Sequence, residues 1–386
     1  MESKKPSQER IIPAAQIHFP EEDIAAMQRE FADILRTGQL VLGERTRIFE
    51  KEFAEYLRAE NALAVSSGTA ALEIAMRCIG VEGKNVIVPA NTFYATAGAV
   101  LHAGAKLKLG DIENETFGLD SESAVKLIDD DTAAIVVVHI GGTPSKDLMK
   151  LRQICDERGI KLIEDSAHAH GSSVDGKKVG TIGDIGTFSF FPTKVMTSGE
   201  GGMVVSNNQD VIKNGRIYRD QGKASGGRNF HTHLGYAWRM SEIHALLGIS
   251  QLHRLDEFIA NRRMIARIYD DGLNSLPGVS PAKIPTGLES NYYKYIVMLS
   301  NDVDRESLKA EMKKLGVSLS GEVYSDGLHS QPVFQNRYEG NNSGFSNTDD
   351  FCAKHICLPI SGIMTEEDAH YVLKKLYEVC GYSGTR

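Results

Sequence analysis

The chain has 386 residues, of which 41% are hydrophobic and 24% charged; these proportions are typical of a folded enzyme with a large core. The formal net charge is −8 and no long run of Lys or Arg occurs, which argues against nucleic acid as a partner. The first ten residues are polar and no apolar run approaches the length of a membrane span. We therefore expect no membrane partner and a cytoplasmic location.

The five cysteines are odd in number and show no CxxC spacing. This pattern predicts neither a disulfide framework nor a zinc ribbon, and we expect reduced thiols that are buried or half-buried. Histidine pairs occur, but no acidic or cysteine partners stand at ligand spacing, so no metal site is predicted.

Residues 1–20 are predicted to form an N-terminal lead, and two amphipathic helices follow. The first helix begins with three acids after Pro20 and ends at Gly38. Its apolar residues share one stripe, which consists of Ile24, Met27, Phe31 and Leu35. The second helix is expected to bury a line of Phe49, Phe53 and Leu57.

A strand from Asn61 to Val65 runs into the turn Ser66-Ser67-Gly68-Thr69 and then into a helix. A turn of small residues at a helix N-terminus can bind an anion such as phosphate, because free N–H groups and the helix dipole point to the same place. The same residues also suit an ordinary helix cap that binds nothing. Further along, Phe93 stands where a loop enters a helix, either in the core or facing a ligand.

The strand from Ile160 to Ile163 brings Glu164 and Asp165 to its carboxyl end, the edge at which open α/β sheets bind ligands. Asp165 also suits a helix cap. His168, three residues later, is either a buried structural histidine or part of the same site.

Seven strand-like runs lie between Asn61 and Val205, and most of them alternate with helices. This order predicts an α/β fold with a mainly parallel sheet that helices cover on both faces. No GxGxxG motif follows a strand, which argues against a dinucleotide-binding site. After the sheet, a long helix is predicted from Ser241 to Arg263.

The segment from Thr187 to Asn208, TFSFFPTKVMTSGEGGMVVSNN, contains two strand-like runs with Lys194 between them. A lone lysine on a turn is most often solvated. A lysine in an apolar pocket, however, loses its charge readily and can become a nucleophile that forms a Schiff base.

This segment resembles the lysine motif of the DegT/DnrJ/EryC1/StrS family of sugar aminotransferases, which use pyridoxal 5'-phosphate (PLP). In that family Ser-Phe precedes the PLP lysine and Gly-Glu-Gly-Gly follows it; here these are Ser189-Phe190, Lys194 and the run from Gly199 to Gly202. The resemblance extends from about Val41 to about Arg263. A sister group of sugar dehydratases has histidine at the lysine position, so Lys194 favours transamination.

The resemblance implies an aspartate-aminotransferase-like fold (fold type I of PLP enzymes). Its large PLP-binding domain, with a seven-stranded sheet, would occupy residues 21–263, and a small C-terminal α+β domain would occupy residues 264–386. It also implies roles for individual residues. Gly68, Thr69 and Ser189 would hold the cofactor phosphate and Phe93 would stack on the ring. Asp165 would pair with the ring nitrogen, His168 would lie near the ring hydroxyl, and Lys194 would be the catalytic residue.

The family usually reads Gly-Tyr-Asn-Tyr-Arg-Met in a loop whose Asn reaches the PLP phosphate of the partner subunit. This chain has Ala237 at that position, with Tyr236 and Trp238 on either side. The resemblance still implies a homodimer with active sites at the interface. Residues 321–324 and 329–334 resemble the family's substrate-edge loop.

We therefore predict an aminotransferase of amino-sugar biosynthesis that moves an amino group from L-glutamate to a keto-sugar, which we expect to be nucleotide-linked. Two alternatives stay open. The acceptor could be a cyclitol or a small phosphorylated ketone, because the motifs indicate which cofactor is bound and do not identify the acceptor. The chain could also be a regulatory protein that binds PLP without turnover.

Overall fold

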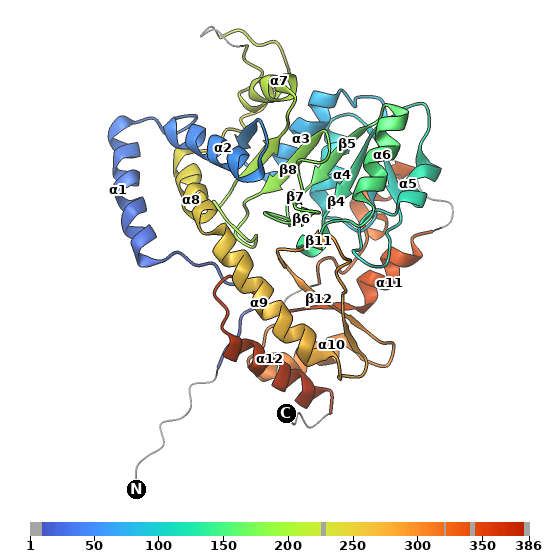
Figure 1. The fold of residues 1–386 in the computed structure, drawn as a ribbon. Coiled ribbons are helices and arrows are strands. Elements are labelled where there is room, and N and C mark those ends of the chain that lie inside the picture. The colour runs from blue at the N-terminus through green and yellow to red at the C-terminus, as the bar shows by residue number, and fades with distance from the viewer. Residues whose placement is uncertain (1–9, 225–228, 320–321, 340–343, 382–386) are drawn as a thin grey trace.

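The structure is a computed structural model that describes residues 10–224, 229–319, 322–339 and 344–381. Figure 1 shows a large part built around one sheet and a smaller part that contains both described ends of the chain. The predicted N-terminal lead is described from residue 10 onwards. There Ile12 is buried and pairs with Val317 of the smaller part.

The large sheet has eight strands among the described residues, in the order β1-β9-β8-β5-β4-β2-β3-β13. All of them run parallel to one another except β9, which is antiparallel to both of its neighbours. Their bounds are β1 (Ala62–Val65), β2 (Asn85–Pro89), β3 (Lys106–Gly110), β4 (Thr132–Val138), β5 (Lys161–Asp165), β8 (Ile185–Ser189), β9 (Gly202–Val205) and β13 (Tyr338–Glu339). The α/β prediction is confirmed, and the eighth strand comes from the C-terminal third of the chain.

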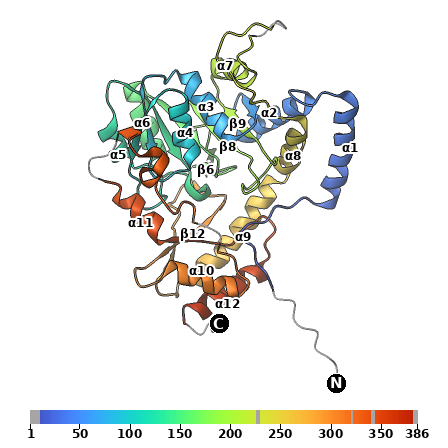
Figure 2. The same cartoon turned by 180° about the vertical axis from the view of Figure 1, so that it is seen from behind.

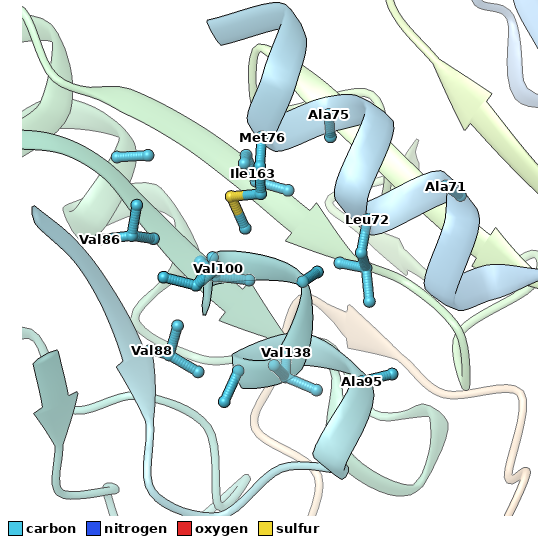
Figure 3. Packing of buried hydrophobic residues seen from close by; sticks show 14 of the residues in the cluster. Ala71, Leu72, Ala75, Met76, Val86, Val88, Ala95, Val100, Val138 and Ile163 are labelled. Carbon is cyan, nitrogen blue, oxygen red and sulfur yellow. The ribbon is translucent and has the colours of Figure 1, made fainter. Parts of the chain in front are cut away.

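Both faces of the sheet are covered because successive strand residues point to opposite sides. In β2, Val86 and Val88 pack with α3 (Gly68–Ile79) and α4 (Tyr94–His102), whereas Ile87 packs with α5 (Ser121–Leu127) and α6 (Leu148–Arg158). Figure 3 shows the first of these layers, with Met76 and Leu72 of α3 lying over the strand valines. The helix α7 (Gln209–Arg219) extends the first layer, and α2 (Glu44–Leu57) covers the second face near β1.

The smaller part contains the antiparallel sheet β10-β12-β14, which packs against helices. Its elements are β10 (Val279–Pro281), β12 (Tyr295–Leu299), α10 (Arg305–Lys314), α11 (Ser346–Lys354), β14 (His355–Leu358) and α12 (Glu366–Val379). A third small sheet consists of β6 (Ser173–Val174), β7 (Lys177–Lys178) and β11 (Leu288–Glu289). Three short 3-10 helices complete the description: η1 (Ile140–Gly142), η2 (Leu328–Ser330) and η3 (Pro332–Phe334).

One sequence prediction about the helices was wrong in detail. The predicted helix from Ser241 to Arg263 is two helices, α8 (Glu242–His253) and α9 (Leu255–Leu273), which meet at Arg254. The predicted buried line of α2, Phe49, Phe53 and Leu57, is confirmed. In α1 (Glu21–Thr37), by contrast, Phe31 and Leu35 of the apolar stripe are 40% and 54% exposed. Figure 2 shows why: α1 stands at the periphery and covers no sheet.

The predicted domain boundary after residue 263 lies inside α9, which continues to Leu273. The first turns of α9 pack with α2 and α8, and its later turns pack with the small sheet and α12. The division into residues 21–263 and 264–386 therefore stays a prediction. None of the helices described is both long and apolar enough to cross a membrane.

Candidate active site

A cavity of about 430 Å³ lies beside the carboxyl ends of β5 and β8. The parallel strands end at this edge, and the N-terminus of α3 and the start of α4 reach the same place. The cavity is lined by all seven residues predicted from the sequence: Gly68, Thr69, Phe93, Asp165, His168, Ser189 and Lys194. The fold thus brings the seven residues together, while their individual roles remain predictions.

Lys194 lies in the loop between the antiparallel strands β8 and β9. Its main-chain N–H donates to the carbonyl of Phe191 at 2.9 Å, and its Nζ lies 5.0 Å from the centroid of the Tyr293 ring. Burial lowers the pKa of the Lys194 amine, and Tyr293 and Asp165 offset only part of this effect. A lower pKa increases the neutral, nucleophilic fraction of a lysine.

Asp165 is the last residue of β5 and is buried. Its Oδ2 accepts a hydrogen bond from Thr96 Oγ1 at 2.8 Å, and its Oδ1 accepts one from the N–H of Ala167 at 3.2 Å. Burial raises the pKa of Asp165 because these two donors stabilise the charged form only in part. The carboxylate is therefore oriented towards the cavity and would gain from a cationic partner there.

The N-terminus of α3 supplies backbone donors at one end of the cavity. The first N–H groups of a helix have no partner within the helix. Ser67 caps one of them, since its Oγ accepts from the N–H of Ala70, and its carbonyl accepts the first helical hydrogen bond from Ala71. Within the described part of the chain the N–H groups of Gly68 and Thr69 remain available for an anion.

Gly68 also explains how α3 approaches β8 so closely. A Cβ at this position would lie 2.7 Å from the Cβ of Ser189, closer than such atoms pack. Glycine therefore places the helix N-terminus and the Ser189 hydroxyl at one end of the cavity.

Aromatic rings form another side of the cavity. Phe93 is 59% exposed and stacks against Tyr324, with ring centroids 6.4 Å apart and an interplanar angle of 27°. The ring of His168 lies 4.5 Å from that of Tyr293, and its Nε2 lies 3.4 Å from the hydroxyl of Tyr324. Burial holds the pKa of His168 well below its usual value, so the ring is neutral. Its buried Nδ1 has no hydrogen-bond partner among the described residues.

Three lining or supporting residues were missed by sequence reasoning: Thr96, Tyr293 and Lys294. Tyr293 and Lys294 lie in the run from Tyr292 to Tyr295, and β12 begins at Tyr295. The preceding residues form the cavity wall, and the clustering of tyrosines around a lysine was the signal available. Of the predicted substrate-edge loop, residue 321 lies outside the described residues, whereas Glu322, Val323 and Tyr324 line the cavity and residues 329–334 do not.

Glu164 points away from the cavity, although it precedes Asp165. Its carboxylate accepts hydrogen bonds from the N–H groups of Gly180, Ile182 and Gly183 at 2.6–2.8 Å, and it contacts His139 Nε2 at 3.1 Å. Side chains of consecutive strand residues alternate between faces. Glu164 therefore fixes the end of β5, while Asp165 faces the cavity.

The segment around Ala237 lies beside β1. Tyr236 and Trp238 stack with centroids 3.8 Å apart, and the Tyr236 hydroxyl accepts a hydrogen bond from Arg77 at 2.7 Å. Ala237 between them is exposed and pairs with Asp220. Residues 225–228 of the adjoining loop lie outside the described residues.

A model of the DegT/DnrJ/EryC1/StrS aminotransferase family matches residues 21–377. The chain belongs to this family. It is 38% identical to the GDP-perosamine synthase of Vibrio cholerae over 303 residues, which are 78% of this chain and 82% of the relative.

Two solved structures support the same assignment. An aminotransferase from Streptoalloteichus hindustanus superposes with a TM-score of 0.88 at 30% identity, over 96% of this chain and 99% of that one. The PLP form of a Streptococcus pneumoniae protein superposes with a TM-score of 0.88 at 26% identity, over 97% and 100% of the two chains. The predictions of the family, of an aminotransferase and of its fold are confirmed.

The residues present fit PLP. The free N–H groups of Gly68 and Thr69 suit a phosphate, and the buried carboxylate of Asp165 suits a protonated ring nitrogen. The unpartnered Nδ1 of His168 and the open face of Phe93 leave a polar and a flat apolar surface for a ring. Among the residues that the structure describes, no cluster of His, Cys, Asp and Glu could hold a metal ion.

Proposed function

We propose that this DegT/DnrJ/EryC1/StrS aminotransferase uses PLP to move an amino group from L-glutamate to a nucleotide-linked keto-sugar. The observation that carries the proposal is the placement of Lys194 and Asp165 in one cavity with the N-terminus of α3. The name of the Vibrio cholerae relative, a GDP-perosamine synthase, supports a nucleotide-linked sugar as the acceptor.

PLP, when bound, accepts the negative charge that develops on an amino-acid carbon and carries nitrogen from donor to acceptor. Lys194 would hold the cofactor and then, as a free amine, move the proton at the substrate carbon. Asp165 would hold the proton on the ring nitrogen, and the N-terminus of α3 with Ser189 would bind the phosphate. Phe93 would cover the ring and exclude water from one face.

The test is a turnover assay with the purified, PLP-loaded protein, L-glutamate and a panel of acceptors. The panel contains GDP-linked and UDP-linked keto-sugars, a keto-cyclitol and a small phosphorylated ketone. We expect 2-oxoglutarate to form together with an amino-sugar nucleotide that mass spectrometry identifies. Turnover of the cyclitol or the phosphorylated ketone alone would contradict the sugar assignment. A cofactor spectrum that glutamate leaves unchanged would favour the alternative of a regulatory protein that binds PLP without turnover.

We also propose that the enzyme is a homodimer. The exposed apolar residues of α1 and the segment after it support a protein partner, since such residues gather at interfaces; they are Phe31, Leu35, Leu40 and Val41. Sedimentation velocity should give twice the chain mass, and Leu35→Glu should shift the protein towards monomer. A wild-type monomer at micromolar concentration would overturn this proposal. A cytoplasmic location remains a prediction that cell fractionation can check.

A further inference from the structure

The cavity contains a second lysine, for which the family resemblance assigned no role. Lys294 lines the cavity, and its Nζ lies 5.4 Å from the centroid of the same Tyr293 ring that Lys194 approaches to 5.0 Å. Among the described lining residues, Lys194 and Lys294 are the ones with amine side chains, and none is an arginine.

The charge of Lys294 is not neutralised by the described part of the protein. No ion pair or hydrogen bond of its ammonium group occurs there, and the lining carboxylates do not pair with it. Asp165 accepts from Thr96 and from a backbone N–H, and Glu322 pairs with Lys309 at 2.8 Å. Glu200, the third lining carboxylate, forms no ion pair with Lys294. A cation that has no ion-pair partner in a partly buried cavity favours the binding of an anion.

The backbone that carries Lys294 is fixed on one side by the large sheet. The N–H of Lys294 donates to the carbonyl of Gly141 at 2.9 Å, in the turn that follows β4. A Cβ on Gly141 would lie 2.7 Å from Ile296, so the turn approaches β12 as closely as glycine permits.

The same segment is fixed on its other side by Asn291, which is fully buried. The amide nitrogen of Asn291 donates to the carbonyls of His168 and His170, both at 2.9 Å, and its amide oxygen accepts from the N–H of Tyr293 at 2.8 Å. Lys294 is thus held in a defined position relative to the loop that contains His168. Such preorganisation lowers the entropic cost of binding a ligand.

The amino donor needs a cation of this kind. An α-amino acid enters the cavity with an α-carboxylate beside the reacting carbon, and Lys194 cannot serve it while its amine is engaged with the cofactor. We propose that Lys294 binds the α-carboxylate of the amino donor and that of the keto acid which leaves. This inference rests on the proposed aminotransferase function and adds the residue that selects an amino acid as nitrogen donor.

The test compares three variants with the wild type, all PLP-loaded. Lys294→Met removes the charge and keeps the length of the side chain, whereas Lys294→Arg keeps the charge. Lys283→Met is the matched control, because Lys283 is exposed and does not line the cavity. The measurements are KM and kcat for donor and acceptor, and the Kd of 2-oxoglutarate by calorimetry.

We expect Lys294→Met to raise the KM for glutamate and the Kd of 2-oxoglutarate by about tenfold to a hundredfold, the range of a hydrogen bond to a charged group. The KM for the acceptor should change little, Lys294→Arg should retain most of the affinity, and Lys283→Met should match the wild type. Unchanged donor KM and Kd in Lys294→Met would overturn the inference, as would a loss confined to the nucleotide-linked acceptor.

The two proposals can fail separately. If the wild type produces no amino-sugar yet binds 2-oxoglutarate in a manner that depends on Lys294, the proposed reaction fails and the carboxylate site stands. If the wild type turns over and Lys294→Met is indistinguishable from it, the carboxylate site alone is wrong. If the wild type neither turns over nor binds 2-oxoglutarate, both proposals are wrong.

Discussion

The two walls of the cavity are built in different ways. The first wall consists of residues 67–69, 165–168 and 189–194 at the ends of α3, β5 and β8, elements that belong to the large sheet and its helices. The second wall consists of residues 291–294 and 322–324 and is held in place across long sequence separations. Asn291 and His168, for example, are 123 residues apart. We propose that the first wall serves the cofactor chemistry and that the second selects the substrates.

Loss of Lys194 should give the largest effect and would place the chemistry in the first wall. Lys194→Ala removes the amine of the loop between β8 and β9, so we expect no detectable turnover. Lys177→Ala, at an exposed position in β7, is the control and should be fully active. Borohydride reduction of the wild type followed by peptide mass analysis should find the cofactor on Lys194. Cofactor on a different lysine would refute the assignment.

Asp165→Asn should give the second largest loss of turnover. A carboxylate beside a protonated ring nitrogen contributes about 1.5–3 kcal/mol as a charge-assisted contact, and it also keeps the ring a strong electron acceptor. We therefore expect a loss in kcat of at least about a hundredfold with PLP still bound. Near-normal turnover would mean that another group faces the ring nitrogen.

The same variant should have the opposite effect on the stability of the cofactor-free protein. Burial raises the pKa of Asp165 in the folded state, so the stability contributed by the protonated carboxyl is complete below the unfolded pKa. It is lost as the pH rises through the folded pKa. Asn carries no charge, and we expect the variant to unfold at a higher temperature than wild type near pH 8, with the difference shrinking in acid. Equal melting temperatures at pH 8 would contradict this.

Asn291→Ala tests the second wall. It leaves the carbonyls of His168 and His170 and the N–H of Tyr293 without their partner, and we expect a loss of about 2–4 kcal/mol in the free energy of unfolding. Donor KM should rise more than kcat falls, because Lys294 loses its fixed position. Asn301→Ala, at an exposed site, is the control for denaturant titrations. A stability equal to that of the wild type would show that the three hydrogen bonds of Asn291 do not stabilise the fold.

Thr96→Val should give the smallest effect. It removes one of two donors to Asp165, and the N–H of Ala167 remains. The expected loss is about 1 kcal/mol, or roughly fivefold in kcat. Thr96→Ser keeps the hydroxyl and should stay close to wild type in the same assay. A hundredfold loss in Thr96→Val would instead mean that the threonine acts on the reacting atoms.

The large sheet was predictable because its strands are short apolar runs that alternate with helices, a local pattern. The break at Arg254 was not, since the residues on both sides of it continue a helical pattern. The exposure of Phe31 and Leu35 was also unpredictable. An apolar stripe shows that a helix face needs a partner and not whether that partner belongs to the same chain.

The first wall of the site could be predicted residue by residue because Gly68, Asp165 and Lys194 stand in recognisable local motifs. The second wall could not. Tyr293 and Lys294 carry no motif, and contacts distant in sequence bring them to the cavity: Asn291 pairs with a loop 123 residues away, and Lys294 pairs with Gly141. Contacts of this kind depend on the tertiary fold, which a single sequence does not display.

The helix α9 joins two hydrophobic cores. Phe258 and Ile259 pack in the core beside α2 and α8, while Tyr269 and Leu273 pack in the core of the small sheet. A helix of 19 residues has a length of about 28 Å, and its backbone hydrogen bonds run without interruption between the two cores. Unfolding of either core would destabilise α9, on which the other core depends, so we expect both parts of the chain to unfold cooperatively. A fragment that begins at residue 264 would lack the first half of α9 and should not fold independently.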